Sequence, residues 1–211
     1  GAVGCVVRED VTAPSNFRAT GTFGDWLAAK GKILVGSSGG ETGVRGFVAA
    51  FDAETGKEAW RTFTTAEPGT PGGDTWPGDT AKHGGASVWI TGTYDAKNNI
   101  AYWGTGNPAP WPTEGRPGDN LYTTSTIALD VDTGKIKGHH QYHYNDAWDW
   151  DEVSAPVLID TEIKGKKTPV AVRAARNGYM WVLERTSNGA LKYVNAWPYV
   201  GNNVFKSLDP K

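Results

Sequence analysis

The stretch "AAFDAETGKEAW" at residues 49–60 decides the fold, because the chain repeats it. The second copy is "IALDVDTGKIKG" at residues 127–138, and a looser third copy is "WVLERTSNGALKYVNAW" at residues 181–197. The two closer copies read as a strand, an Asp, two residues, Thr-Gly-Lys and a second strand. The Gly suits a backbone with positive φ, so each copy predicts a β-hairpin. Repeated antiparallel units with Gly and aromatic signatures are typical of a β-propeller.

Strand-like runs surround these repeats, and helical periodicity is nearly absent from the chain. Each run is short, rich in β-branched or aromatic residues, and bounded by Gly, Asn, Asp or Pro. The predicted strands cover residues 31–38, 46–52, 86–95, 99–106, 125–132, 168–175 and 178–185. A β-sandwich uses the same hairpins and is the alternative fold, but the repeat favours the propeller. A blade takes about 40–50 residues, so the chain has room for about four blades.

Composition narrows the classes of function. The 211 residues carry a formal net charge of -2, and the charged residues are scattered along the chain. This pattern excludes a strongly basic surface for nucleic acid. No apolar run approaches the roughly 18 residues that a membrane span requires. The chain contains 28 Gly, 12 Pro and 10 Trp, which suits short strands joined by tight turns. Cys5 is the only cysteine, so no disulfide forms within the chain.

Two long loops and one pair of acidic residues mark a candidate site. The loops at residues 64–85 and 107–124 are rich in Pro and Gly and too long for hairpins, and such loops often carry function. In "WDWDEV", residues 148–153, Asp149 and Asp151 lie two positions apart. In an extended chain their side chains would point to the same side. The pair forms either a solvated turn or a site for a hard cation, which binds carboxylate oxygens.

Five segments together resemble one known family. They are "GETGVRGFVAAFDAETGKEAWR" (40–61), "YWGTGNPAPW" (102–111), "RPGDNLYTTS" (116–125), "NDAWDWDEV" (145–153) and "ARNGYMWVLERT" (175–186). With these segments the chain resembles the quinoprotein alcohol dehydrogenases of the methanol and ethanol type. The resemblance implies an all-β, eight-bladed propeller with pyrroloquinoline quinone and a metal ion at its centre. We therefore expect a divergent N-terminal segment at residues 1–30 and a partial propeller, carrying the site motifs, at residues 31–211.

The resemblance also implies a set of metal ligands. Glu41 and Asn107 match the family's metal ligands, and Asp149 matches its catalytic base, which lies close to the metal. Asp151 stands at a position that is Asp in the lanthanide-dependent branch and small or uncharged in the calcium enzymes. Three carboxylates at one point repel one another, and a trivalent ion neutralises them better than a divalent one. This favours a lanthanide ion over calcium. The alternative is that Asp151 turns outward or hydrogen-bonds a loop while calcium occupies the site.

Other positions match the residues that hold the quinone in the family. Arg176 precedes Asn-Gly and matches the Arg that hydrogen-bonds the quinone oxygens. Trp89, eighteen residues before Asn107, matches the Trp on which the quinone stacks. The further cofactor contacts that the resemblance implies are Ser38, Gly39, Ser87 and Arg8. The family has two adjacent cysteines over the quinone, and here only Cys5 is present, so that disulfide cannot form.

The function implied by the resemblance is oxidation of a primary alcohol to an aldehyde by hydride transfer to metal-bound pyrroloquinoline quinone. The metal would polarise the quinone carbonyl, Arg176 would add fixed positive charge, and Asp149 would take the alcohol proton. The indole of Trp89 would supply a flat apolar surface for the cofactor. The resemblance also implies a small alcohol substrate, a cytochrome c as electron acceptor and a periplasmic location, and it allows a homodimer.

Three alternatives compete with this interpretation. The first is a non-catalytic propeller fragment that serves as a binding or structural scaffold, which a test of cofactor binding would separate from the enzyme. The second is a carbohydrate-active protein, but glycosidase carboxylates flank the bond at least about 5 Å apart, whereas Asp149 and Asp151 are near neighbours. The third is a transition-metal site at His139 and His143, which has no visible third ligand.

Overall fold

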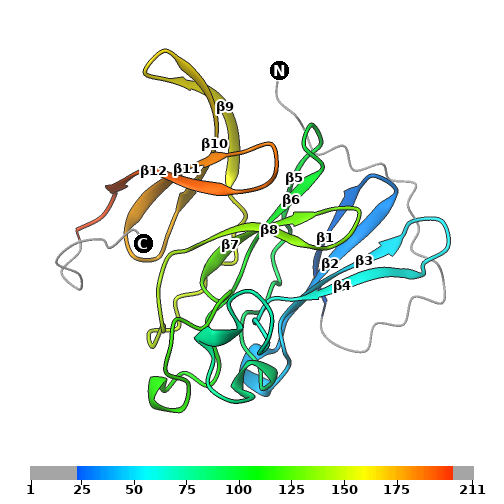
Figure 1. Ribbon diagram of the computed structural model, residues 1–211, viewed down its shortest axis with the longest axis vertical. Helices are drawn as coiled ribbons and strands as arrows, with labels where there is room; N and C mark the ends of the chain where they lie inside the picture. The colour runs from blue at the N-terminus through cyan, green and yellow to red at the C-terminus, as the bar shows by residue number, and fades with distance from the viewer. Residues whose placement is uncertain (1–22, 202–211) are drawn as a thin grey trace.

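The computed structural model describes residues 23–201, and within this range the regular elements are β-strands and short 3-10 helices (Figure 1). The first sheet contains β1 (Phe23–Ala29), β2 (Lys32–Ser37), β3 (Phe47–Asp52) and β4 (Glu58–Phe63). The second contains β5 (Thr93–Asp95), β6 (Ile100–Gly104), β7 (Ser125–Asp130) and β8 (Ile136–Gln141). The third contains β9 (Val157–Ile163), β10 (Lys166–Ala174), β11 (Tyr179–Arg185) and β12 (Leu191–Pro198). The 3-10 helices are η1 (Gly40–Thr42), η2 (Gly73–Thr75), η3 (Thr80–Lys82) and η4 (Thr113–Gly115).

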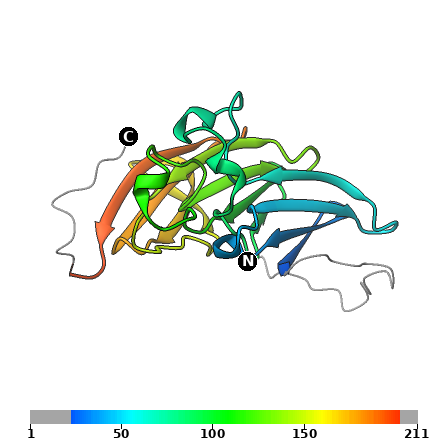
Figure 2. The same ribbon diagram turned by 90° about the horizontal axis from the view of Figure 1, so that it is seen from below.

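Each sheet is an antiparallel meander whose four strands follow one another in chain order. The first strands of the sheets are neighbours, β1 with β5 and β5 with β9, and the fourth strands β8 and β12 also contact each other. Figures 1 and 2 show the three sheets side by side, as successive blades. The prediction of an all-β propeller is therefore confirmed. The described residues hold three such blades, within the estimate of about four.

The repeated motif forms a hairpin in each blade, and the first two hairpins share the same turn. The copies supply the third and fourth strands of their sheets, β3–β4, β7–β8 and β11–β12. In the first turn, the Asp52 carboxylate accepts hydrogen bonds from the N–H and the hydroxyl of Thr55, and Gly56 has a φ of 68°. Asp130 makes the same bonds to the residue three positions later, and Gly134 has a φ of 72°. The predicted hairpins are confirmed, with the Gly where positive φ is needed.

The strands differ most from the prediction in three places. The first sheet begins at Phe23, eight residues before Gly31, where the sequence suggested that the propeller starts. Within the predicted strand 86–95, only β5 is a strand. The strand-like runs of the sequence do not include β9, because most of its residues are exposed and it carries Asp and Glu among its apolar residues. The Gly, Asp and Ala residues of β1 and the polar residues of β9 are uncommon in strands, so the sequence did not indicate these two strands. They form because of packing against their neighbours.

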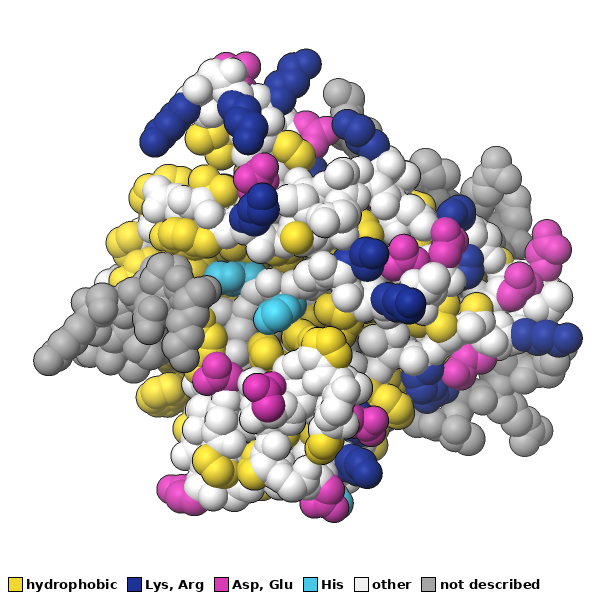
Figure 3. All heavy atoms as spheres, in the orientation of Figure 1, with side chains coloured by type: hydrophobic (Ala, Val, Ile, Leu, Met, Phe, Trp, Pro, Cys, Tyr) yellow, Lys and Arg dark blue, Asp and Glu magenta, His cyan; other side chains and the backbone are white. Residues whose placement is uncertain are grey.

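The surface of the described residues carries charges of both signs. Figure 3 shows Lys and Arg side chains gathered at the top of the view, over the hairpin of β9 and β10. The exposed lysines of this hairpin are Lys164, Lys166 and Lys167. None of the helices in residues 23–201 is both long enough and apolar enough to cross a bilayer.

Candidate functional site

Loop segments beside the first two sheets meet through hydrogen bonds to Ser87. The N–H of Gly40 donates a hydrogen bond of 2.9 Å to the Ser87 hydroxyl, and the N–H of Gly106 donates one of 2.8 Å to the Ser87 carbonyl. These bonds join three segments that are far apart in the sequence. Glu41 follows Gly40 in η1, and Asn107 follows Gly106 after β6. The structure therefore brings the two predicted metal-binding segments to the same place.

Asp151 lies where these segments meet. Its side chain is half-buried, and its Oδ1 accepts a hydrogen bond of 3.0 Å from the N–H of Asn107. Burial is the main cause that raises the pKa of Asp151 from 3.8 to about 6, and the Asp149 and Glu41 carboxylates raise it further. The Asn107 hydrogen bond and the Arg176 charge act in the opposite direction. Burial, more than the neighbouring charges, thus disfavours the ionised form of Asp151.

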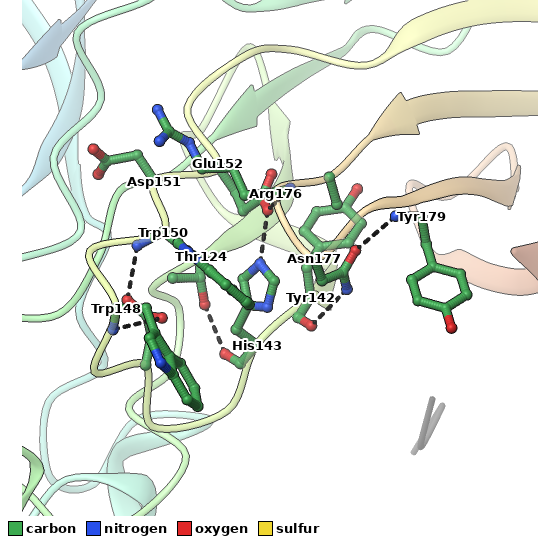
Figure 4. A network of polar contacts seen from close by, with 12 residues as sticks. Thr124, Tyr142, His143, Trp148, Trp150, Asp151, Glu152, Arg176, Asn177 and Tyr179 are labelled. Carbon is green, nitrogen blue, oxygen red and sulfur yellow. Dashed lines mark hydrogen bonds and ion pairs between the residues drawn. The ribbon is translucent and has the colours of Figure 1, made fainter. Parts of the chain in front are cut away.

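Asp149 differs from its neighbour in backbone and in exposure. Its φ is 60°, so the extended geometry considered for Asp149 and Asp151 is wrong at this residue, and Asp149 is exposed. The carboxylate of Asp146 accepts hydrogen bonds from the N–H of Trp148 (3.3 Å) and of Trp150 (3.0 Å), which folds the segment back (Figure 4). The two indoles stack with their ring centroids 5.1 Å apart. Local capping by Asp146 therefore decides how the two aspartates are presented.

The donor atoms around Asp151 suit a hard cation, because carboxylate and amide oxygens are the ligands that large oxygen-binding ions prefer. Glu41, Asp149 and Asp151 supply carboxylates and Asn107 supplies an amide. Within residues 23–201, however, no three His, Cys, Asp or Glu side chains already lie close enough together to hold a metal ion. The ligand set is thus of the right chemistry, and its carboxylates are not drawn together.

The predicted cofactor residues lie next to this point. Trp89 is half-buried, and a Cβ at Gly106 would lie 3.2 Å from Cζ3 of its ring and 2.8 Å from Oδ1 of Asp151. Gly106 therefore allows the indole and the carboxylate to approach the same backbone. Ser38 is half-buried, and Gly39, with a φ of 88°, precedes η1. Arg8 lies outside the described residues.

Arg176 approaches from the third sheet. It lies in the turn between β10 and β11, and its side chain is exposed. Its backbone N–H donates a hydrogen bond of 2.7 Å to Oε1 of Glu152. Figure 4 shows Asp151, Glu152 and Arg176 close together, although Arg176 belongs to a different connection of the chain. The site is thus assembled from all three sheets.

The two histidines of the alternative metal site have separate partners. The ring of His139 lies edge-on to Tyr122, with centroids 4.8 Å apart. His143 hydrogen-bonds Glu152 at 2.7 Å through Nε2. No group of three metal-binding side chains includes either histidine in the described part of the chain. The structure therefore gives no support to a transition-metal site at this pair.

Two buried charged residues near the site were missed by the sequence analysis. Glu152 and Arg116 are both fully buried, with 0% of their surface exposed. Arg116 donates hydrogen bonds to the Asn120 and Asn145 side chains and to the backbone carbonyls of Trp111 and Asp146. It therefore ties the loop after β6 to the segment that carries the aspartates. Nothing in the sequence distinguishes such a buried Arg or Glu from an exposed one, because Arg173 and Arg176 are more than 20 residues from Glu152, and Asn145 and Asp146 are about 30 residues from Arg116.

Three successive four-stranded antiparallel sheets define this chain as part of a β-propeller. The family described as "PQQ: Glucose/ethanol/alcohol dehydrogenase, beta-propeller domain" matches residues 21–197. The chain belongs to this family.

Relatives and solved structures agree with this assignment. The chain is 40% identical to the quinoprotein alcohol dehydrogenase PedH of Pseudomonas putida, over 82% of this chain and 31% of that protein. It is 38% identical to methanol dehydrogenase [cytochrome c] subunit 1 of Methylorubrum extorquens, over 86% of this chain and 32% of that protein. The structure of a europium-containing methanol dehydrogenase superposes with a TM-score of 0.78 at 38% identity, over 84% of this chain and 34% of that one. The chain thus spans about a third of the length of these relatives.

Proposed function

We propose that this chain carries the metal and quinone site of a quinoprotein alcohol dehydrogenase that oxidises a primary alcohol to an aldehyde. The observation that carries the proposal is the position of Asp151. Its half-buried carboxylate lies against Asn107 and under the influence of Asp149, Glu41 and Arg176. A bound cation would compensate the charge of the half-buried Asp151 carboxylate and of its exposed neighbours Asp149 and Glu41. Membership of the family supports this assignment.

Glu41, Asn107, Asp149 and Asp151 are the residues that would hold the metal ion. Three carboxylates favour a trivalent lanthanide ion over calcium, because the larger charge offsets more of their mutual repulsion. A structural relative that contains europium is consistent with this preference. The hydrogen bond between Asp151 and the Asn107 N–H opposes it, because that oxygen already has a partner. A direct comparison of the two metals decides between them.

The proposed chemistry divides between the cofactor and the chain. When bound, pyrroloquinoline quinone would supply a hydride acceptor for the alcohol carbon, and the metal ion would supply a Lewis acid. Asp149 takes the hydroxyl proton, and its exposure leaves its carboxylate accessible to a substrate. Arg176 supplies fixed positive charge, and the Trp89 indole supplies a flat surface. The alcohol thereby loses one hydride and one proton and becomes an aldehyde.

The remaining assignments follow the family and extend the proposal. Ser38, Gly39, Ser87 and Arg8 would contact the cofactor. The electron acceptor would be a cytochrome c, a partner that the name of the Methylorubrum relative carries. The protein would act in the periplasm, with a small alcohol as substrate, and the proposal also allows a homodimer.

The test is a titration of the protein, in its full natural length, with pyrroloquinoline quinone. Uptake is followed by absorbance with lanthanum, with calcium and with neither metal, for the wild type and for Asp151→Asn. We expect uptake with lanthanum that Asp151→Asn weakens at least about 10-fold. Equal uptake with calcium, unchanged in the variant, would overturn the lanthanide assignment. No uptake with either metal would contradict the proposed function and favour the scaffold.

Alcohol-dependent dye reduction tests the proposed base. Asp149→Asn is expected to lower the rate constant kcat at least about 100-fold, because the general base is lost. Asp74→Asn, an exposed Asp in η2, is the matched control and should leave the rate unchanged. A rate in Asp149→Asn close to that of the wild type would exclude Asp149 as the base.

A further inference from the structure

The buried carboxylate of Glu152 lies at the crossing of four segments of the chain. Its Oε1 accepts a hydrogen bond of 2.7 Å from the backbone N–H of Arg176 and forms another, also of 2.7 Å, with Nε2 of His143. Its Oε2 accepts a hydrogen bond of 2.9 Å from Nε of Arg173 and a second one from Nη2 of the same guanidinium. Its backbone N–H donates a hydrogen bond of 3.1 Å to the carbonyl of Thr105. Every one of these bonds except that to His143 spans more than 20 residues.

These contacts connect the proposed metal-binding segment at Asp151 with the turn that carries Arg176. Glu152 directly follows Asp151, so its backbone belongs to the metal-binding segment, and the Thr105 bond fixes that segment beside β6. Its side chain reaches into the third sheet, where Arg173 lies on β10 and Arg176 begins the next turn. Figure 4 shows the carboxylate between the Asp151 segment and the turn of Arg176. Glu152 thereby links the segment of Asp151, a proposed metal ligand, to the turn of Arg176, a proposed quinone contact.

A purely structural explanation accounts poorly for this arrangement. A buried ion pair contributes little net stability compared with apolar residues of similar volume, because both charges are desolvated. What a buried charged network provides is directional contacts. The bond that matters here is the one from Oε1 to the Arg176 N–H, because it acts on the backbone of a proposed cofactor contact.

We propose that Glu152 is a positioning residue, whose Oε1 holds the Arg176 turn at the distance from Asp151 that quinone binding requires. This inference rests on the proposed function, since it names what sets the geometry of that site. Arg173 fixes the rotamer of the carboxylate, and His143 shares the same oxygen. The residue touches neither metal nor quinone and acts only through its neighbours.

Two double variants separate positioning from stability. Both replace Arg173 by Met and so remove the ion pair, and they differ only at residue 152. Glu152→Gln/Arg173→Met keeps an oxygen that can accept the Arg176 N–H, whereas Glu152→Met/Arg173→Met does not. We expect quinone affinity within about 3-fold of the wild type for the first and about 10- to 100-fold weaker for the second. Exposed Glu162→Gln on β9 is the control.

Three measurements are made on the protein in its full natural length. Terbium luminescence, excited through tryptophan, reports metal binding without quinone, and absorbance reports quinone uptake. We expect both double variants to bind terbium as the wild type does. Equal quinone affinity in the two variants, or equal loss of terbium binding, would overturn the positioning role. A wild type that binds neither ligand would instead contradict the proposed function.

Amide hydrogen exchange at Arg176 covers the case in which the methionine variant does not fold. The Arg176 N–H should exchange slowly in the wild type and in Glu152→Gln/Arg173→Met, because both keep its acceptor. Rapid exchange of this amide in the wild type would show that the Glu152 bond is absent, and would overturn the proposal.

Discussion

The junction between the first and second sheets differs from the junction between the second and third. The first is apolar: one cluster of buried side chains runs through both sheets and includes Leu34, Val48, Trp60, Trp103 and Ile127. The second has two smaller apolar clusters. One is made of Ile100, Tyr102 and Ala128 with Leu158 and Leu191 packed against it, and the other of Tyr142, Ala175 and Trp181. Neighbouring blades of the same fold are thus held together by different chemistry.

Charged groups occupy much of the second junction. Arg185 on β11 pairs with Asp95 on β5, and both side chains are nearly buried, 5% and 6% exposed. His140 on β8 packs its ring against Trp181 of β11, with centroids 4.8 Å apart. The Glu152 network lies between the same two sheets. The Arg176 part of the proposed site is therefore supported where the contacts are polar and directional.

At both junctions, the fourth strand of one blade lies against the turn between the third and fourth strands of the next blade, but the contacts differ. Trp60 of β4 donates a 3.0 Å hydrogen bond from Nε1 to the Val131 carbonyl, and its ring lies against Gly134, where a Cβ would be 2.5 Å away. The equivalent residue of β8 is Gly138, where a Cβ would lie 2.4 Å from the Gly189 carbonyl. The Trp60 indole packs between strand and turn at the first junction. At the second junction Gly138 has no side chain, and the two backbones lie in direct contact. This confirms that the second copy of the repeat packs differently.

Replacing Trp60 by Ala should have the largest effect, because it empties the apolar junction. We expect a loss of about 3–5 kcal/mol in the free energy of unfolding, from lost burial and the cavity left behind. Urea unfolding followed by circular dichroism measures it. Trp26→Ala is the control, because that side chain is 47% exposed. Similar losses in the two variants would show that the apolar junction is not the stronger support.

Replacing Arg185 by Met tests the polar junction. Removing one partner leaves the buried Asp95 carboxylate uncompensated, and we expect a loss of about 3 kcal/mol in the free energy of unfolding. The double variant Asp95→Asn/Arg185→Met should regain most of this, because no buried charge remains. Equilibrium unfolding of the single and double variants gives the coupling between the residues. Additive losses would mean that the pair does not join the sheets.

Replacing Gly138 by Ala should sharpen the contrast between the two docking modes. The added Cβ would meet the Gly189 carbonyl at 2.4 Å, a backbone atom that cannot rotate away. We expect a loss of about 1–3 kcal/mol by overpacking. Gly115→Ala, where nothing lies within 4 Å of the added atom, should change stability by less than about 0.5 kcal/mol. Thermal unfolding of both variants is sufficient, and equal Tm values would exclude close docking at Gly138.

Acidification should weaken the second junction more than the first. Burial, with a smaller contribution from His139, lowers the pKa of His140 from 6.5 to about 4. The unfolded chain therefore binds this proton first, and stability is lost as the pH falls from 6.5 to 4. Between pH 7 and pH 6 the loss from His140 is less than about 1 kcal/mol, the smallest of these effects.

His140→Phe is the matched variant, because it keeps an aromatic ring and removes the titrating group. Asp151 contributes with the opposite sign: its raised pKa lets the folded chain bind a proton first, so its contribution favours folding as the pH falls. The informative quantity is therefore the difference between wild type and His140→Phe in the free energy of unfolding, measured across pH 7 to 5. A difference that does not change with pH would refute the role of His140.

The turns and hairpins could be predicted because their causes are local. In Asp-x-x-Thr-Gly-Lys the Asp binds groups two or three residues away and the Gly adopts positive φ, so the pattern carries its own explanation. The site motifs were also found, through their resemblance to a family. The geometry of Asp149 was not, because its left-handed backbone depends on how Asp146 caps the following residues. Alternation along a strand predicts nothing where the chain leaves the strand.

The sequence alone determined that this chain is a run of β-hairpins with a propeller repeat, since these features depend on residues close together in the chain. Only the tertiary structure decided which segments lie beside the candidate residue Asp151 and what supports them. The sequence "WDWDEV" gives no sign that Glu152 is buried and paired, because its partners Arg173 and Arg176 lie more than 20 residues away in the chain. Hydrogen bonds are short and directional, so a buried polar partner is recognised only once the sheets are in place.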